Sequence, residues 1–245
     1  MEILAVRIDN FSKKEILEKI EFFLTEPKLH QIATVNPEFV LRAQKDLEFK
    51  NILNKADLNV ADGVGIWYAF FRYGDRLKNR IAGADLMEMI LEIADEKSLK
   101  IFLAVNKDGL SNFNEIASAL KKKYPSINFV GGEFDSSHQS SVISDPDEIK
   151  KDDRLLMTDD CILFCNFGAP FQEKFIFAQK PAKIRIAMGV GGSFDFVTGK
   201  ILRAPLWMQK IGLEWLWRFL QEPKYRLKRI INAVVVFPIK VLFNK

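Results

Sequence analysis

The sequence predicts an α/β protein with a mainly parallel sheet that is covered by helices on both faces. Short apolar runs alternate along the chain with segments of helical periodicity, the apolar runs contain few polar residues, and several of them end in turns that contain glycine. Strands that are apolar throughout are typical of parallel sheets buried on both faces. With 245 residues, of which 48% are hydrophobic, the chain is long enough for one large domain.

The first quarter of the chain predicts three strands with helices between them. Residues Ile3–Ile8 form the first predicted strand, and Ser12–Glu15 is a capping box that precedes apolar residues at helical spacing. Gln31–Val35 is the second predicted strand, and Asn36-Pro37 is a favourable N-cap and first-turn pair for the following helix. Leu58–Ala61 is the third predicted strand.

The rest of the chain repeats this order. The predicted elements are a helix over Gly83–Ala94, a strand over Lys100–Val105, a helix ending near Tyr124, and strands over Ile127–Val130, Cys161–Phe164 and Ile184–Met188. The stretch 131–160 has no clear period and is predicted as a loop with one helix around Asp147–Leu156. We therefore expect a Rossmann-like core over residues 1–199 and a helical appendage over residues 200–245.

Charge is concentrated at the C-terminus. The chain as a whole has 36 basic and 32 acidic residues, a balance that does not indicate a nucleic-acid-binding protein. Residues 200–245, however, contain ten Lys and Arg and two acidic residues. They also contain the apolar segment Ile230–Leu242, whose thirteen residues are too few to span a bilayer and in which Pro238 is expected to interrupt a helix. This segment can pack on the core, or it can lie in a membrane interface, which the adjacent basic residues and three nearby tryptophans fit.

Other residues indicate a protein of a reducing compartment. Cys161 and Cys165 lie four positions apart on a predicted strand, a rise of about 13 Å that is too long for a disulfide. We expect both to be buried thiols. The N-terminus has no basic region followed by an apolar one, so no export signal is predicted. His30 and His138 are isolated, and no spacing typical of a metal or cofactor site is found, so we expect a cytoplasmic protein with neither.

The stretch Asn59–Leu86 carries the strongest functional signal. A strand ends at Asp62, and the Gly63–Gly65 turn leads into an apolar helix. In an open α/β sheet this edge binds ligands, and glycines leave the backbone amides accessible. An N-cap with ordinary turn glycines would explain the same residues. Similar turns at Gly168–Pro170 and Gly189–Gly192 favour a ligand that carries phosphate.

Seven segments in a fixed order resemble one enzyme family. They are Thr34–Glu38, Ala61–Gly65, Arg80–Leu86, Gly168–Lys174, Gly189–Phe196, Arg203–Pro205 and Gly212–Arg218. Together they are similar to the WecG/TagA/CpsF glycosyltransferase family from about residue 1 to Arg229. The resemblance implies an inverting enzyme that moves a sugar, commonly of the N-acetylmannosamine type, from a UDP-sugar to a polyprenyl-diphosphate-linked sugar in cell-surface polysaccharide synthesis. It also implies action at the cytoplasmic face of the cell membrane without a bound metal.

The resemblance assigns roles to individual residues. Asp62 matches the catalytic base, which takes a proton from the acceptor hydroxyl. The residues that match the substrate pocket are Thr34, Asn36, Arg80, Gln172, Arg218, Arg226 and Arg229, of which the last three are suited to hold diphosphate. The residues that match the nucleotide-binding part are Gly168, Gly189, Gly191 and Asp195.

Some questions stay open at this point. The turn Val105–Gly109 has one glycine where the family often has several, so its role in nucleotide binding is undecided. A nucleotide-binding regulatory protein would keep the glycine turns without needing Asp62, and a membrane-surface scaffold would need only the basic, apolar C-terminus. The expected partners are a UDP-sugar, a polyprenyl-diphosphate-linked acceptor and an anionic membrane surface. The sequence does not specify the donor sugar, the pathway or whether the chain forms a homo-oligomer.

Overall fold

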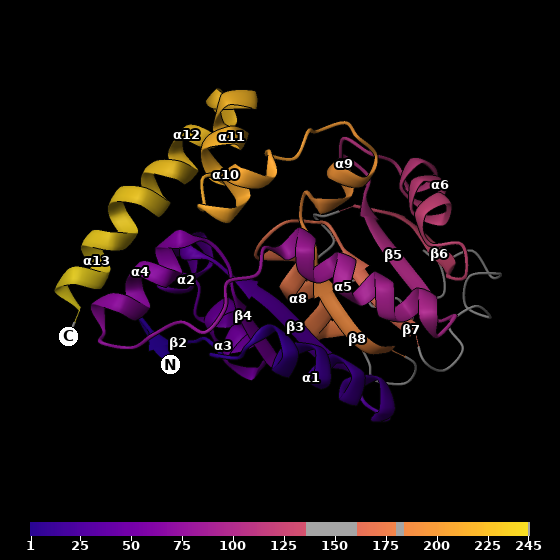
Figure 1. Cartoon of the computed structure of the whole chain (residues 1–245), viewed down its shortest axis with the longest axis horizontal. Helices are drawn as coiled ribbons and strands as arrows, with labels where there is room; N and C mark the ends of the chain where they lie inside the picture. The colour runs from indigo at the N-terminus through magenta and orange to yellow at the C-terminus, as the bar shows by residue number, and fades with distance from the viewer. Residues whose placement is uncertain (136–160, 180–183, 245) are drawn as a thin grey trace.

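A six-stranded parallel sheet forms the centre of the molecule. The computed structural model describes residues 1–135, 161–179 and 184–244 (Figure 1). The strands are β3 (His30–Val35), β4 (Leu58–Ala61), β5 (Lys100–Asn106), β6 (Asn128–Phe134), β7 (Cys161–Cys165) and β8 (Ile184–Gly189). They lie in the order β4-β3-β8-β7-β5-β6, and every neighbouring pair is parallel. The predicted fold class is confirmed.

Helices cover both faces of this sheet (Figure 1). One face packs against α1 (Lys13–Thr25), α5 (Gly83–Glu96), α6 (Phe113–Lys123) and α9 (Ser193–Val197), and the other against α2 (Pro37–Ala43), α3 (Leu47–Lys55), α4 (Val64–Arg72) and α8 (Phe171–Ala178). Successive strand residues point to opposite faces, so in β3 Ile32 belongs to one core whereas Ala33 and Val35 belong to the other. The sheet thus separates one hydrophobic cluster on the first face from two clusters on the second.

The N-terminus forms a hairpin, so the prediction of one strand over Ile3–Ile8 is wrong. β1 (Glu2–Ile3) and β2 (Val6–Arg7) pair antiparallel around Leu4 and Ala5. These two residues have φ values of 49° and 59°, in the left-handed region. Tight hairpin turns with this backbone usually contain Gly or Asn, and because neither is present the sequence gives no sign of the turn.

Several local predictions agree with the structure. The capping box at Ser12 is formed, and Asn36 caps α2 through its side chain. Cys161 and Cys165 are free and buried, and burial raises the pKa of the Cys161 thiol to about 12. β6 extends to Phe134, past the predicted end of that strand. The helix predicted around residues 147–156 lies outside the described residues.

The chain after residue 199 forms helices that lie beside α4 and α2 (Figure 1). They are α10 (Leu206–Lys210), α11 (Glu214–Gln221), α12 (Pro223–Ile231), the π-helical turn η1 (Asn232–Val236) and α13 (Phe237–Phe243). The prediction that Pro238 interrupts the helix is wrong, since helical structure continues through it. The wider π turn directly before Pro238 offers a way to accommodate a proline. Phe237 and Val241 are fully buried in the core that α2 and α4 share.

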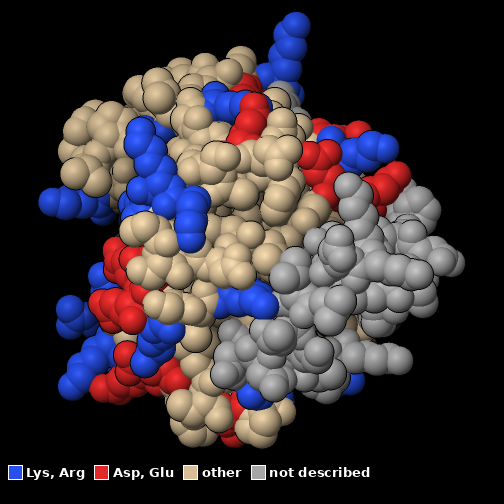
Figure 2. Space-filling view, turned by 90° about the vertical axis from the view of Figure 1, so that its right-hand side faces the viewer, with Lys and Arg blue, Asp and Glu red and all other residues tan. Residues whose placement is uncertain are grey.

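On the face drawn in Figure 2, some Lys and Arg side chains adjoin one another at the upper left, and below them Lys and Arg are interspersed with Asp and Glu. No helix among the described residues combines the length and the apolar character needed to cross a bilayer.

Candidate active site

The carboxyl ends of the parallel strands bring the predicted site segments to one edge of the sheet. The N–H of Asp62, after β4, donates to the carbonyl of Val35 in β3 at 2.9 Å. The N–H of Val190, after β8, donates to the carbonyl of Cys165 in β7 at 2.8 Å. Ligands bind at this edge in open α/β sheets. The loops that follow these four strands therefore form the candidate site.

Asp62 lies between the end of β4 and the start of α4. The next residue, Gly63, has a φ of 83°, which glycine adopts readily. As a whole residue Asp62 is partly exposed, and the pKa of its carboxyl group is raised to about 7, first by burial and then by the negative charge of Glu214. The positive charges of Arg80 and Arg218 act in the opposite direction. A carboxyl group with a pKa near neutrality has the property that a general base needs.

Arg80 lies in the loop between α4 and α5 and contacts the C-terminal region. Its Nη2 donates a hydrogen bond to the carbonyl of Gln209 at 2.9 Å. Gly212, in the turn between α10 and α11, has a φ of 79°, and a Cβ there would lie 2.1 Å from Cγ1 of Val64. The C-terminal region therefore rests directly on the start of α4, two residues after Asp62.

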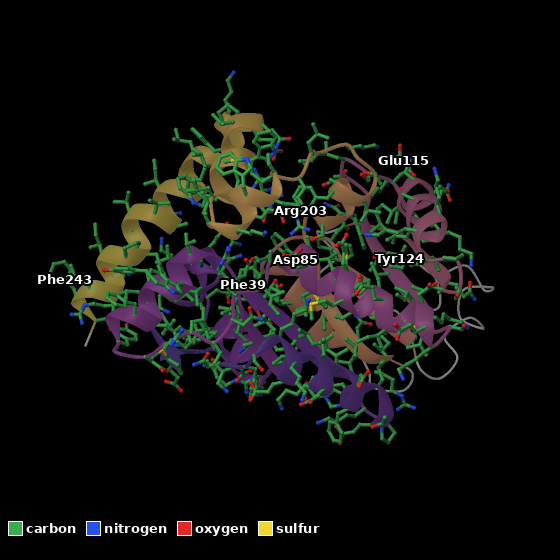
Figure 3. The ribbon with its side chains drawn as sticks, viewed as in Figure 1. Phe39, Asp85, Glu115, Tyr124, Arg203 and Phe243 are labelled. Carbon is green, nitrogen blue, oxygen red and sulfur yellow. The ribbon has the colours of Figure 1, made fainter. Side chains whose placement is uncertain are left out.

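Arg203 joins the C-terminal region to α5. Its Nη2 lies 2.5 Å from Oδ1 of Asp85, and its Nε lies 3.6 Å from Oε1 of Glu214. Figure 3 shows Arg203 and Asp85 next to each other, below the C-terminal helices. Arg203 thus holds both Asp85 and Glu214, the two carboxylates whose negative charges raise the pKa of Asp62. The sequence reasoning gave none of these three residues a role of its own, although each lies in a segment that carries the family resemblance.

Arg218, on α11, is a guanidinium group that burial makes less basic. Its central carbon lies 5.0 Å from the centre of the Phe196 ring, and a Cβ on Gly192 would lie 3.0 Å from its Nη2. Burial, followed by the positive charge of Arg226, lowers its pKa to about 10, and Arg229 acts in the same direction. Its Nε is buried without a hydrogen-bond acceptor in the described part of the chain. An anion beside the Gly192 turn would offset both penalties.

Arg226 and Arg229 lie on α12 and form ion pairs within the protein. Nη2 of Arg226 is 2.7 Å from Oε2 of Glu222, and Nη2 of Arg229 is 2.6 Å from Oε2 of Glu38 on α2. The charges of both arginines act on Arg218. The structure therefore brings the three predicted arginines together, with two of them paired to carboxylates.

Gln172, in the first turn of α8, directs its amide into the protein and is 4% exposed. Its Oε1 accepts hydrogen bonds from the N–H groups of Gly168 at 3.1 Å and Gly191 at 3.2 Å. Its Nε2 donates to Oε1 of Glu173 at 2.7 Å. A Cβ on Gly189 would lie 2.3 Å from this Nε2, so the glycine makes room for the amide. Gln172 was expected among the substrate-binding residues, whereas here its polar atoms join the turns after β7 and β8.

Thr34 and Asn36 lie at the end of β3, beside Asp62. Thr34 is 8% exposed, and its Oγ1 lies 3.1 Å from the position of a Cβ on Gly83, so it packs against the start of α5. Oδ1 of Asn36 accepts a hydrogen bond from the N–H of Phe39 at 3.1 Å. Both residues stand at the predicted edge, and Asn36 also fixes the start of α2.

Asp195, on α9, is held by the loop that follows β5. Its Oδ1 accepts a hydrogen bond from Oγ of Ser111 at 2.8 Å, and this hydroxyl is also 2.8 Å from Oγ1 of Thr198. No spacing in the sequence singled out Ser111. The turn Val105–Gly109 is closed by hydrogen bonds to Asn106, including one from the N–H of Gly109 to its carbonyl at 2.9 Å. A single glycine is enough for this turn.

The histidines stand apart from this site as far as the structure describes them. His30 lies at the opposite end of β3 from Thr34, stacked on Phe23, with ring nitrogens 3.0 Å from Glu26 and 3.1 Å from Asp57. His138 lies outside the described residues. Over residues 1–135, 161–179 and 184–244, no group of three His, Cys, Asp or Glu side chains is placed to hold a metal ion.

Comparison with known proteins identifies the family. The model of the Glycosyl transferase WecG/TagA/CpsF family matches residues 1–245. The chain is 31% identical over 203 residues to the N-acetylglucosaminyldiphosphoundecaprenol N-acetyl-beta-D-mannosaminyltransferase of Bacillus subtilis (strain 168), with 82% of this chain and 75% of that protein covered. It is 30% identical over 248 residues to the protein of the same name from Staphylococcus aureus (strain MW2), with 98% and 91% covered. Because the match spans the whole chain and includes the segments that form the site, the chain belongs to the WecG/TagA/CpsF glycosyltransferase family.

Proposed function

We propose that this glycosyltransferase moves an N-acetylmannosamine-type sugar from a UDP-sugar to a polyprenyl-diphosphate-linked acceptor, with inversion at the anomeric carbon. The observation that carries the proposal is the position of Asp62 at the carboxyl edge of the sheet, where the positive charges of Arg80 and Arg218 act on its carboxyl group. The names of the relatives, which describe a mannosaminyltransferase and a diphosphoundecaprenol acceptor, support these substrate classes. Synthesis of a cell-surface polysaccharide is the corresponding role.

The proposed reaction is a single displacement with Asp62 as the base. The acceptor hydroxyl oxygen attacks the anomeric carbon from the face opposite the UDP. The bond from this carbon to the diphosphate oxygen breaks as the new carbon–oxygen bond forms, and UDP departs with the bonding electrons. Asp62 takes the hydroxyl proton, and its pKa of about 7 suits a base that works near neutral pH.

The departing UDP gains negative charge that must be stabilised, and we assign this role to the guanidinium group of Arg218. The buried Nε of Arg218 lacks an acceptor in the described part of the chain, and its Nη2 lies beside Gly192. Diphosphate oxygens would provide that acceptor and stabilise the charge that develops on departure. The residues assigned to the nucleotide are Gly168, Gly189, Gly191 and Asp195, and those assigned to the remaining substrate pocket are Thr34, Asn36, Arg80, Arg226 and Arg229. Gln172 is assigned to the same region through the turns that its amide holds.

We further propose residues 200–245 as a membrane-associating appendage of the catalytic core, residues 1–199. The run from α12 to α13 buries Phe237 and Val241 on one side. Its exposed apolar side chains are Leu227, Ile231, Val234, Val235, Ile239, Leu242 and Phe243. An apolar helix surface with adjacent basic residues suits the interface of an anionic membrane. The protein would then act as a peripheral protein at the inner face of the cell membrane, where it meets its lipid-linked acceptor.

The transfer reaction is tested with a panel of UDP-sugars and a prenyl-diphosphate-linked N-acetylglucosamine acceptor. Mass spectrometry identifies the product, and NMR gives the anomeric configuration. Asp62→Asn is expected to lower turnover at least about a hundredfold with little change in UDP affinity. UDP binding without transfer would favour a regulatory protein, and retention of configuration would contradict the single displacement.

Membrane association is tested by sedimentation with anionic liposomes. Val235 and Ile239 are 49% and 51% exposed, so the double variant Val235→Glu/Ile239→Glu places charge on the proposed membrane surface without disturbing the core. We expect the bound fraction to fall several-fold. Phe22→Glu, which alters a 56% exposed residue on α1, is the matched control and should bind as the unaltered chain does. Equal binding of both variants would contradict this assignment.

A further inference from the structure

Glu173 is a buried carboxyl group that the proposed reaction does not use. It follows Gln172 in α8, is 2% exposed, and burial raises its pKa to about 7. Its Oε1 accepts the hydrogen bond from Nε2 of Gln172, while its Oε2 is buried without a hydrogen-bond partner among the described residues. Burying a carboxyl group costs free energy unless other interactions offset the cost. Its place beside the site therefore needs an explanation.

The hydrogen bonds of Gln172 permit one orientation of its amide. The N–H groups of Gly168 and Gly191 can only donate, so both require the amide oxygen. The amide nitrogen must then face position 173, where only an acceptor satisfies it. Glu173 supplies that acceptor, and its charge strengthens the hydrogen bond. Loss of the acceptor would leave a buried N–H unsatisfied, so this orientation of the amide would be held less firmly.

The orientation of Gln172 in turn fixes the turn after β8. Gly191 has a φ of 49°, and its N–H is held by Gln172. The next residue, Gly192, lies against Nη2 of Arg218. A change in the Gln172 amide would therefore release the backbone at the point where the guanidinium group of Arg218 meets the turn.

We propose that Glu173 is a positioning residue that sets donor affinity through Gln172. It orients the Gln172 amide so that the turns after β7 and β8 keep the geometry that binds the nucleotide diphosphate. Glu173 itself does not contact the substrate. The inference rests on the proposed function, in which these turns face UDP.

Two substitutions of Glu173 that differ in one hydrogen-bonding property test this proposal. Glu173→Met removes the acceptor for Nε2 of Gln172, whereas Glu173→Gln keeps an amide oxygen that can accept the same hydrogen bond. We expect UDP affinity, measured by calorimetry, to fall at least about tenfold in Glu173→Met and to stay within about threefold of the unaltered chain in Glu173→Gln. Glu21→Gln, which alters an exposed glutamate on α1, is the control and should change nothing.

Hydrogen exchange at the amides of Gly168 and Gly191 provides a second readout that does not depend on UDP. We expect faster exchange at both amides in Glu173→Met than in Glu173→Gln. Equal UDP affinity and equal exchange in these two variants would overturn the proposal. If Glu173→Met does not fold, Glu173→Leu, which also lacks an acceptor, takes its place in the comparison. If the unaltered chain does not bind UDP, the donor assignment fails and the exchange data alone decide the role of Glu173.

Discussion

Replacing Asp62 with asparagine should stabilise the protein while it removes the proposed base. The pKa of Asp62 is about 7 in the folded protein against an ordinary value of 3.8, because burial opposes the charged form. Above pH 7 the carboxyl group is ionised in both the folded and the unfolded chain, so the folded state carries the full penalty. At about 1.4 kcal/mol for each pH unit between the two values, this penalty is about 4 kcal/mol, and partial exposure of the side chain makes this an upper limit.

Differential scanning calorimetry at two pH values measures this effect. About 2 kcal/mol, half of the upper limit, corresponds to a rise in Tm of about 4 °C or more for a chain of this length. At pH 5 the folded group is protonated and the unfolded group is largely ionised, so the gain should be about a third of that at pH 8. Asp75→Asn, at an exposed carboxylate, serves as the control. An Asp62→Asn variant no more stable than the unaltered chain at pH 8, or equally stabilised at both pH values, would refute the argument.

Three other perturbations test the charges and the packing around the site. Glu214→Gln should move the acid limb of the pH profile of kcat/KM to lower pH, because Glu214 raises the pKa of Asp62, and an unmoved profile would contradict this coupling. Excess EDTA should leave the transfer rate unchanged, because we assign the charge of the leaving group to Arg218, whereas a loss restored by Mg²⁺ or Mn²⁺ would contradict that assignment. Phe237→Ala should lower the free energy of unfolding in urea by about 3–5 kcal/mol, because the ring is fully buried, while Phe243→Ala, at a residue 80% exposed, should change it by less than about 0.5 kcal/mol.

The strands of the sheet could be predicted because burial on both faces leaves short runs that are mostly apolar. The run that ends at Asp62 and the run that contains both cysteines belong to strands of this kind. The N-terminal hairpin could not be predicted, since its turn residues, Leu4 and Ala5, have no intrinsic preference for positive φ. Continuation of the helical structure through Pro238 could not be predicted either, because no recognised sequence pattern marks the π turn that precedes it.

Part of the candidate site could be predicted from a single rule about parallel sheets. The rule that ligands bind at the carboxyl edge of a parallel sheet places Asp62 and the glycine turns without knowledge of the rest. It says nothing of Glu214, a residue far along the chain that forms an ion pair with Arg203 and whose charge raises the pKa of Asp62. The rule also does not show that the amide of Gln172 faces the protein interior. A glutamine at the start of a helix can equally direct its amide toward a ligand.

The core that contains Phe237 and Val241 also contains Ile3, Phe39 and Phe70, so the two ends of the chain complete one hydrophobic cluster. A ribosome makes the N-terminal residues first, and at typical rates roughly 10 to 40 seconds separate Phe39 from Phe237. During this time the growing chain has an incomplete core, and it also lacks the arginines of α11 and α12. We therefore expect chaperones to cover the nascent chain until its release. Chains that lack Phe237 and Val241 should therefore be degraded rather than persist as partly active enzymes.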